Sequence, residues 1–209
     1  MAQNYAVLTG DLIGSDDLAP DALDAAMSAL ATSADAIGGA VFARRGGDGW
    51  QVAIPALSIG EVREGHNGHE LRHALTLRAA LRTLGKAYAT RIAIANGPGT
   101  LPAEGDPNAA HGPAFTASGR LLEALPSGAG MAHAAGGALD AVTRLADHVS
   151  AAWTPAQARA MAVMLPRDAP IRADAAKRLG ITRQAVNQAL WAAGYPALDA
   201  ALRLIEDAE

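Results

Sequence analysis

Stretches with the character of β-strands end by residue 134, and only helical patterns follow Thr154. Upstream, short apolar runs alternate with segments whose apolar residues recur every three or four positions, which is typical of a domain that mixes strands with helices. Downstream, Thr154 and Pro155 are the residue types of a helix N-cap and first helical position. The sequence therefore predicts an α+β domain over residues 1–150 and a small all-helical domain over residues 151–209.

The expected strands are short apolar runs bounded by turn residues, at 5–9, 41–45, 50–55, 91–95 and 131–134. The expected helices have apolar residues at helical spacing, at 21–37, 70–84, 115–125 and 138–153. Four residues of a glycine-rich turn separate the second strand from the third, so these two form a hairpin. Residues 12–20 and 96–113 are interpreted as loops, and residues 56–68 fit neither pattern. We expect a sandwich of helices on a mostly antiparallel sheet.

Composition excludes several classes of protein. The chain of 209 residues has no cysteine, which excludes disulfides, thiolate metal sites and a cysteine nucleophile. No basic residue precedes the first apolar run, and no apolar stretch reaches the roughly 18 residues of a membrane span. We therefore expect a cytoplasmic protein with no membrane contact. The formal charge of −4 leaves any nucleic-acid binding to a local patch.

Such a patch is expected in the C-terminal part, which carries 7 basic and 6 acidic side chains, against 10 and 15 in residues 1–150. Gly180 separates a short helix at 173–180 from a second helix capped by Thr182, which predicts a helix-turn-helix. The start of the second helix of this motif enters the major groove of double-stranded DNA. The side chains suited to base edges there are Arg183, Gln184, Asn187 and Gln188. Phosphate contacts are expected from Arg172, Lys177 and Arg178.

These residues resemble the helix-turn-helix of bacterial regulators, which tends to have the sequence A-x-x-L-G-I-[ST]-R-Q-A-V. The resemblance implies DNA binding. The alternative is a helix pair that only packs or that binds a protein, since alanine-rich sequences form helix pairs easily.

Two aspartates lie in glycine-rich surroundings beside expected strands, Asp11 after the first strand and Asp48 in the hairpin. Carboxylates at the ends of adjacent strands can share Mg²⁺, so these two are the candidate metal ligands. Taken singly, each is more simply a turn residue. Backbone amides that lead into a helix can hold a phosphate. The candidates for that role are Leu12, Ile13, Gly14 and Ser15.

The order of these motifs resembles the palm-like fold of class III nucleotidyl cyclases and GGDEF proteins, in which a metal-binding aspartate ends the first strand and a second lies in a K-x-x-G-D-G hairpin. Residues 44–49 match that hairpin with Arg44 in the lysine position, so the resemblance adds Arg44 and Gly47 to the nucleotide-binding candidates. A later family motif, G-x-x-V-N-x-A-x-R-L, is in register with residues 112–121. It keeps Arg120 but has Thr116 for asparagine, so these two are catalytic candidates only if the protein is an enzyme.

The whole chain is similar to the SatD family of bacterial proteins, which pair a cyclase-like region with a C-terminal helix-turn-helix. The matching segments are residues 10–15, 47–51, 91–94 and 112–115. Each is short, and their order carries the resemblance. It implies a ferredoxin-like, cyclase-palm sandwich, with a purine nucleotide and Mg²⁺ as ligands. The replacements at Arg44 and Thr116 imply that binding carries over better than cyclisation.

His69, Glu70 and His73 fit H-E-x-x-H, the pattern of zinc proteases, in which two histidines bind the metal and the glutamate activates water. Arg72 places a charge at a position of the motif that is usually uncharged in zinc proteases, and the glycine of the extended motif is missing. A third ligand could come only from distant residues such as Glu104 or His111. No zinc is therefore expected, and Glu70 is interpreted as a helix-start residue. The three tryptophans are assigned to the core: Trp50, Trp153 and Trp191.

Together the two halves predict a nucleotide-responsive, DNA-binding transcriptional regulator. The alternative is an enzyme, a divergent Mg²⁺-dependent nucleotidyl cyclase or nucleotide hydrolase, and a third interpretation is a protein-interaction module that has lost both activities. We expect a homodimer, because cyclase-like domains tend to pair and helix-turn-helix proteins read two half-sites. Residues 56–68 and 138–153 are the expected contact segments. The nucleotide and the DNA target stay open.

Overall fold

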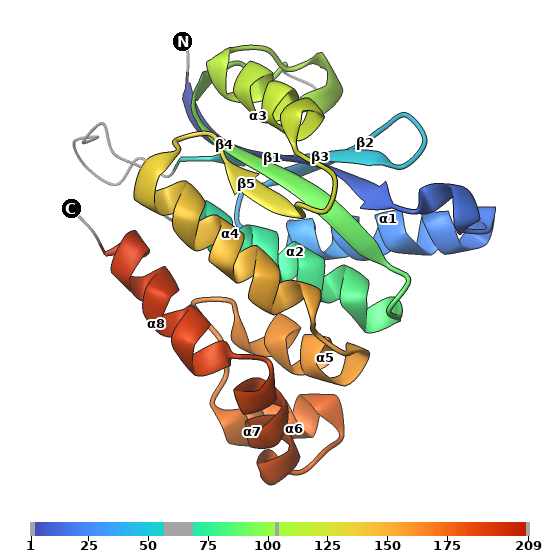
Figure 1. Cartoon of the computed structure of the whole chain (residues 1–209), viewed down its shortest axis with the longest axis vertical. Coiled ribbons are helices and arrows are strands. Elements are labelled where there is room, and N and C mark those ends of the chain that lie inside the picture. The colour runs from blue at the N-terminus through green and yellow to red at the C-terminus, as the bar shows by residue number, and fades with distance from the viewer. Residues whose placement is uncertain (1–2, 57–68, 103–104, 208–209) are drawn as a thin grey trace.

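A five-stranded sheet in the order β2-β3-β1-β4-β5 forms the centre of the molecule (Figure 1). The computed structural model describes residues 3–56, 69–102 and 105–207. The strands are β1 (Gln3–Ile13), β2 (Val41–Arg45), β3 (Gly49–Pro55), β4 (Ala89–Gly99) and β5 (Met131–His133). Neighbours among the first four are antiparallel, and β5 pairs with β4 in parallel. This ferredoxin-like βαββαβ order confirms the expected α+β fold with a mostly antiparallel sheet.

Helices cover both faces of the sheet (Figure 1). They are α1 (Pro20–Asp35), α2 (Glu70–Leu84), α3 (Pro113–Ala124) and α4 (Gly137–Ala151), with short 3-10 turns η1 (Ser15–Asp17) and η2 (Pro107–Ala109). Helix α3 lies on one face, and α1, α2 and α4 lie on the other. Because strand side chains alternate between faces, Val7 joins the small core under α3 while Leu8 joins the large core under α2.

Four C-terminal helices extend the large core beyond residue 150. They are α5 (Pro155–Met164), α6 (Arg172–Leu179), α7 (Arg183–Ala192) and α8 (Tyr195–Glu206). Met161 and Leu190 belong to the same buried cluster as Trp50 and Leu75 of the sheet domain. The Trp153 indole also donates a hydrogen bond to the Ala193 carbonyl at 2.9 Å. Core packing is therefore continuous across residue 150, and independent folding of residues 151–209 stays a prediction.

The helix boundaries in this part follow from local capping. Thr154 and Gln157 form a capping box at the start of α5, as the Thr-Pro signal predicts. Gly180 ends α6 in a left-handed conformation at φ 66°, which glycine adopts without strain. The Thr182 hydroxyl then accepts a hydrogen bond from the Ala185 amide and starts α7. The expected helix pair therefore exists, although helix pairs of this kind have more than one use.

The sheet extends further than the local sequence indicates. Strand β1 continues through Ile13 and β4 through Gly99, both into segments expected to be loops. The two strands pair along their full length, with Ile13 opposite Ala89, so the partner strand overrides the glycine-rich local composition.

Trp191 is 68% exposed, so its assignment to the core is wrong, whereas Trp50 and Trp153 are buried as expected. Residues 57–68, expected to contact a second copy, lie outside the described residues. In the described part of the chain, no helix has the length and apolar character that crossing a membrane requires.

Candidate functional site

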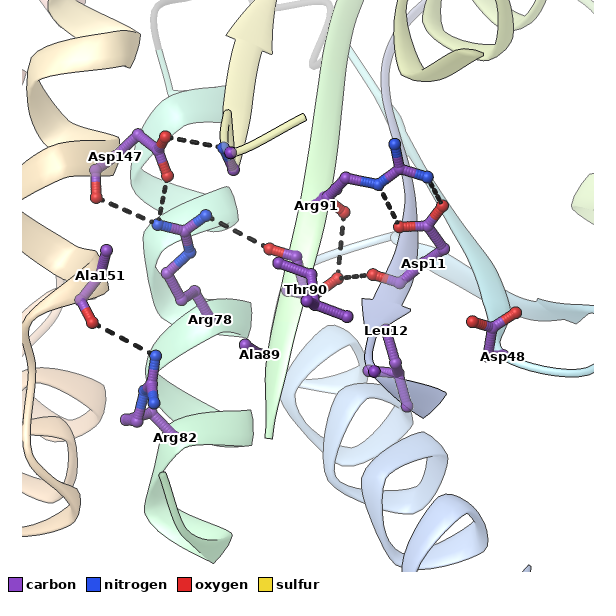
Figure 2. A pocket seen from close by; sticks show the side chains of 14 residues that line it. Asp11, Leu12, Asp48, Arg78, Arg82, Ala89, Thr90, Arg91, Asp147 and Ala151 are labelled. Atoms are coloured by element: carbon purple, nitrogen blue, oxygen red, sulfur yellow. Dashed lines mark hydrogen bonds and ion pairs between the residues drawn. The ribbon is translucent and has the colours of Figure 1, made fainter. Parts of the chain in front are cut away.

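A hollow of about 440 Å³ at one end of the sheet brings Asp11 and Asp48 together (Figure 2). It lies among the end of β1, the start of β4, the β2–β3 turn, the last turns of α2 and the end of α4. Six charged side chains line it, three of each sign: Asp11, Asp48, Asp147, Arg78, Arg82 and Arg91.

Asp11 is engaged by an arginine from the neighbouring strand. Arg91 lies directly opposite Asp11 in the β1–β4 register. Its Nε donates to Asp11 Oδ1 at 2.8 Å, and its Nη2 donates to Asp11 Oδ2. These hydrogen bonds raise the pKa of Arg91, with a further contribution from the charges of Asp11 and Asp48. Both oxygens of the expected metal ligand therefore already face a cation.

This arrangement does not fit a Mg²⁺ ion on Asp11. Ligation of Mg²⁺ by Asp11 and Asp48 would require Arg91 to leave, because its guanidinium covers the carboxylate edge that a metal would use. The second aspartate is also held, since the Ser15 hydroxyl donates to Asp48 Oδ2 at 2.6 Å. Within residues 3–56, 69–102 and 105–207, no group of three or more histidine, cysteine, aspartate or glutamate side chains could hold a metal ion.

Two arginines one turn apart on α2 form the other wall. Arg78 is 5% exposed and donates from Nη1 to Asp147 Oδ1 at 2.6 Å and to Ser150 Oγ at 2.8 Å. Burial lowers its pKa, and the charge of Asp147 opposes that effect. Arg78 is thus a buried cation with its own counter-charge.

Arg82 has a different environment. Its Nη1 donates to the Lys86 carbonyl at 2.6 Å and its Nη2 to the Ala151 carbonyl at 3.3 Å. Its Nε is buried without a partner among the described residues, and no carboxylate of those residues pairs with it. Burial lowers the pKa of Arg82, and no carboxylate of the described residues offsets this effect. The hollow therefore contains one cation whose charge the described residues leave unmatched.

The phosphate-loop candidates are distributed around this hollow. Leu12, Ile13 and Gly14 line it, and Ser15 reaches it through Asp48. The Leu12 amide, however, already donates to the Asp48 carbonyl at 3.3 Å, and Ile13 lies in the paired strand. The Leu12 amide is therefore already used within the fold, and phosphate binding by this segment stays a prediction.

The other cyclase-motif residues lie away from the hollow. Arg44 donates to the Gly47 carbonyl and to Asp24, both at 2.8 Å, and neither Arg44 nor Gly47 is part of the lining. Thr116 and Arg120 are exposed on α3, which covers the sheet face that Asp11 shares with Val7 and Thr9 (Figure 1). Neither residue lines the hollow, so in one copy of the chain this catalytic pair is not part of it.

The helix-turn-helix candidates lie on α6 and α7. Arg183, Gln184 and Gln188 are exposed, as base-reading side chains must be. Asn187 instead accepts a hydrogen bond from Arg172 Nη1 at 2.8 Å, so these two candidates are paired with each other. Lys177 pairs with Asp174 on the surface at 2.9 Å, and Arg178 is exposed. The structure places these groups on one helix pair and does not test DNA binding.

The H-E-x-x-H segment forms buried hydrogen bonds. Glu70 Oε1 accepts from Asn96 Nδ2 at 2.8 Å and lies 3.1 Å from His133 Nε2. The Ala135 amide donates to His133 Nδ1, which leaves the proton on Nε2 to face Glu70. Burial raises the pKa of Glu70, but these hydrogen bonds outweigh it and hold the pKa below its usual value. Glu104 lies outside the described residues.

Sequence reasoning missed Arg78, Arg82, Arg91 and Asp147. A signal was present for one of them. Arg78 falls on the apolar stripe of α2 with Leu71, Leu75 and Leu81, and a charge in a buried stripe requires a partner. Arg91 and Asp147 gave no comparable signal, since each belongs to a pair that only the fold brings together.

No family model matches this chain, and no curated protein matches it. Solved structures do. A guanylyl cyclase crystal structure aligns with 66% of this chain and 80% of its own, at 18% identity and a TM-score of 0.46. The guanylate cyclase domain of RhGC from Catenaria anguillulae, in complex with GTP, aligns over 58% and 72% at 20% identity and a TM-score of 0.43. A bacterial light-regulated adenylyl cyclase aligns over 64% and 43% at 14% identity and a TM-score of 0.45.

Proposed function

We propose that this protein binds a nucleotide, or another ligand that carries phosphate groups, in the hollow between β1, β4, α2 and α4. The observation that carries the proposal is the lining itself: arginines from two elements, β4 and α2, line the same hollow as the aspartates of the cyclase-like motifs. Arginine suits phosphate because its planar fork donates two parallel hydrogen bonds. The volume of about 440 Å³ lies in the range of small-ligand sites.

In this proposal, Arg82 is the main residue that binds the phosphate groups of the ligand. A half-buried cation that is hydrogen-bonded only to carbonyls gains more from an anionic partner than one that already has a carboxylate. Arg78 is already paired with Asp147. Removal of Arg82 should therefore weaken ligand binding more than it weakens the fold.

A thermal-shift screen of nucleotides and pyrophosphate, in Mg²⁺ and in EDTA, tests the proposal. A ligand at about 100 times its dissociation constant should stabilise the fold by about 2.7 kcal/mol. Arg82→Ala should lose this stabilisation. Arg203→Ala should keep it, because Arg203 is an exposed arginine of α8 outside the hollow. If no phosphate-bearing compound raises the melting temperature of the unaltered chain, the proposal fails.

Catalysis, as a divergent nucleotidyl cyclase, is the finer form of this proposal. Because Thr116 and Arg120 are exposed on α3 and do not line the hollow of their own chain, a second copy of the chain would have to supply them. This form therefore includes the expected homodimer. Its test is an assay of cyclic nucleotide formation in which inactive Asp48→Asn and Arg120→Ala chains are mixed. Activity restored by mixing supports it. A monomer in light scattering, or no product from the unaltered chain, counts against it.

DNA binding by α6 and α7 is the second candidate function. It is favoured by the exposed Arg183, Gln184 and Gln188 at the start of a helix that follows a tight turn. Lys177→Ala should then lower the affinity for all duplexes alike and flatten the salt dependence by about one unit. Arg183→Ala should reduce sequence preference. Failure of the unaltered chain to bind any duplex at low salt would remove this function.

A regulator that responds to nucleotide requires coupling between the two sites. Nucleotide and DNA must then change each other's affinity by the same factor. Titration of a bound duplex with and without saturating nucleotide measures that factor. A factor of one would leave two independent activities.

A further inference from the structure

We infer that Arg91 is a built-in cation that occupies the position of a divalent metal ion at Asp11, so that the hollow holds its phosphate-bearing ligand without a metal. This inference rests on the proposed function and specifies the chemistry of the same site.

The Arg91–Asp11 pair is fixed by the sheet. The two residues face each other across the β1–β4 ladder, so backbone hydrogen bonds determine their separation. Thr90 Oγ1 donates to the Asp11 carbonyl at 2.7 Å and accepts from the Trp50 indole at 3.0 Å. At Gly10 there is no room for a Cβ beside the Trp50 ring and the Arg91 carbonyl. A shift of β1 would bring a residue with a Cβ into this space, so the register of β1 is fixed here. The pair is therefore preorganised.

The charges around the pair favour the guanidinium over a metal. Two parallel hydrogen bonds use both oxygens of Asp11, and the nearby Asp48 attracts Arg91 further. A divalent ion on the same carboxylate would lie a few ångströms from the guanidinium, where like charges repel strongly. With Arg91 in place, Asp11 and Asp48 share one cation.

The anion has a separate receptor. In Figure 2, Thr90 of β4 lies between the Arg91–Asp11 pair on one side and Arg82 on the other. Arg82 supplies the charge that the described carboxylates leave unmatched. Arg91 keeps further N–H donors beyond the two used on Asp11, since a guanidinium has five. Because both arginines line the hollow, a ligand with phosphate groups can bind Arg82 on the α2 side of β4 and reach the remaining donors of Arg91 around the end of the strand, with no metal to bridge it to the aspartates.

Calorimetric titration of ATP and GTP into the full chain, in EDTA and in Mg²⁺, is the first test. We expect binding in EDTA with an affinity at least equal to that in Mg²⁺. Binding that appears only in Mg²⁺ would overturn this inference and leave the proposed function intact. Binding of neither nucleotide in either buffer would overturn the inference for purine nucleotides and remove the nucleotide form of the proposed function.

Substitutions at the pair are the second test, with Mn²⁺ measured by electron paramagnetic resonance as the metal probe. Arg91→Ala uncovers Asp11 beside Asp48, so it should gain Mn²⁺ binding that the unaltered chain lacks. It should also lose at least about tenfold in nucleotide affinity in EDTA, the usual effect of a lost charge-assisted hydrogen bond. Asp11→Asn should do the reverse and tighten nucleotide binding, because it releases Arg91 to the ligand.

Two variants control for an altered fold. Arg91→Lys keeps the positive charge, so it should still exclude Mn²⁺ and retain most of the nucleotide affinity. Arg144→Ala removes a comparable Arg–Asp pair on α4 outside the hollow and should change neither measurement. Mn²⁺ binding by the unaltered chain, or an Arg91→Ala chain that is folded and unchanged in both measurements, contradicts the inference.

Discussion

Arg78 and Arg82 lie one turn apart on α2, yet the structure treats their charges differently. Arg78 has a carboxylate, a hydroxyl and a carbonyl around it, which is what a buried guanidinium requires. Arg82 has carbonyls only. A side chain that costs stability without a counter-charge is a better candidate for ligand binding than one that is already satisfied. At the scale of single residues, an arginine without a counter-charge is a candidate for ligand binding, and an arginine with one serves the fold.

His73 predicts a measurable pH dependence of folding. Burial, with the nearby His69 charge, lowers the pKa of His73 from 6.5 to about 4. The unfolded chain therefore binds a proton at a higher pH than the folded chain, so stability falls as pH decreases from 6.5 towards 4. Urea unfolding across this range should show a loss of at most about 3 kcal/mol from this residue. His73→Gln should flatten the curve there. An unchanged slope in that variant would assign the pH dependence to other groups.

Helix α8 is attached to the sheet domain by one buried arginine. Arg72 donates from Nε and Nη2 to the two Glu206 oxygens at 2.6 and 3.0 Å. Its Nη1 reaches Asp199 at 3.0 Å and the Leu165 carbonyl at 2.8 Å. A single side chain of α2 thus joins α8 and the end of α5, and its 3% exposure leaves it little solvent to replace those partners.

Arg72→Met should therefore destabilise the protein by at most about 3–5 kcal/mol, because it leaves the Glu206 carboxylate with only Arg167 and His69 beside it. The matched control is Arg203→Ala, which removes an exposed Arg–Asp pair on the same helix and should cost about 0.5 kcal/mol or less. Chemical denaturation monitored by circular dichroism measures both. Equal effects of the two variants would mean that Arg72 does not attach α8.

Local sequence patterns were sufficient for most elements but not for the charge pairs. The predicted range of α2 agrees with the structure, and β2 and β3 form the predicted hairpin, since apolar period and turn residues are local signals. Strands β1 and β4 were predicted too short, because their ends are stabilised by each other. For the same reason Asp11 was recognised as a candidate while Arg91, 80 residues away and opposite it, was not.

At the scale of the whole molecule, the main question is whether residues 1–150 fold alone. Helix α2 packs against α5, and one buried cluster contains residues from the sheet and from all four C-terminal helices. Apolar surface that loses its cover promotes association.

We expect a fragment that ends at Ala152 to lack cooperative unfolding and to self-associate, as measured by urea denaturation and sedimentation. The full chain should unfold in one transition. A fragment that is monomeric and unfolds cooperatively would instead support the division into two domains predicted from the sequence.

The three tryptophans occupy three different environments, and this gives the protein an intrinsic set of fluorescent reporters. Trp50 is buried and hydrogen-bonded to Thr90, a lining residue of the hollow. Trp153 is buried between the sheet domain and α7, and Trp191 is exposed on α7. Emission of Trp191 should therefore be red-shifted and readily quenched by iodide, while Trp50 should respond to ligands. The emission wavelength of single-tryptophan variants would report nucleotide binding, helix packing and changes at the α7 surface, without any attached dye.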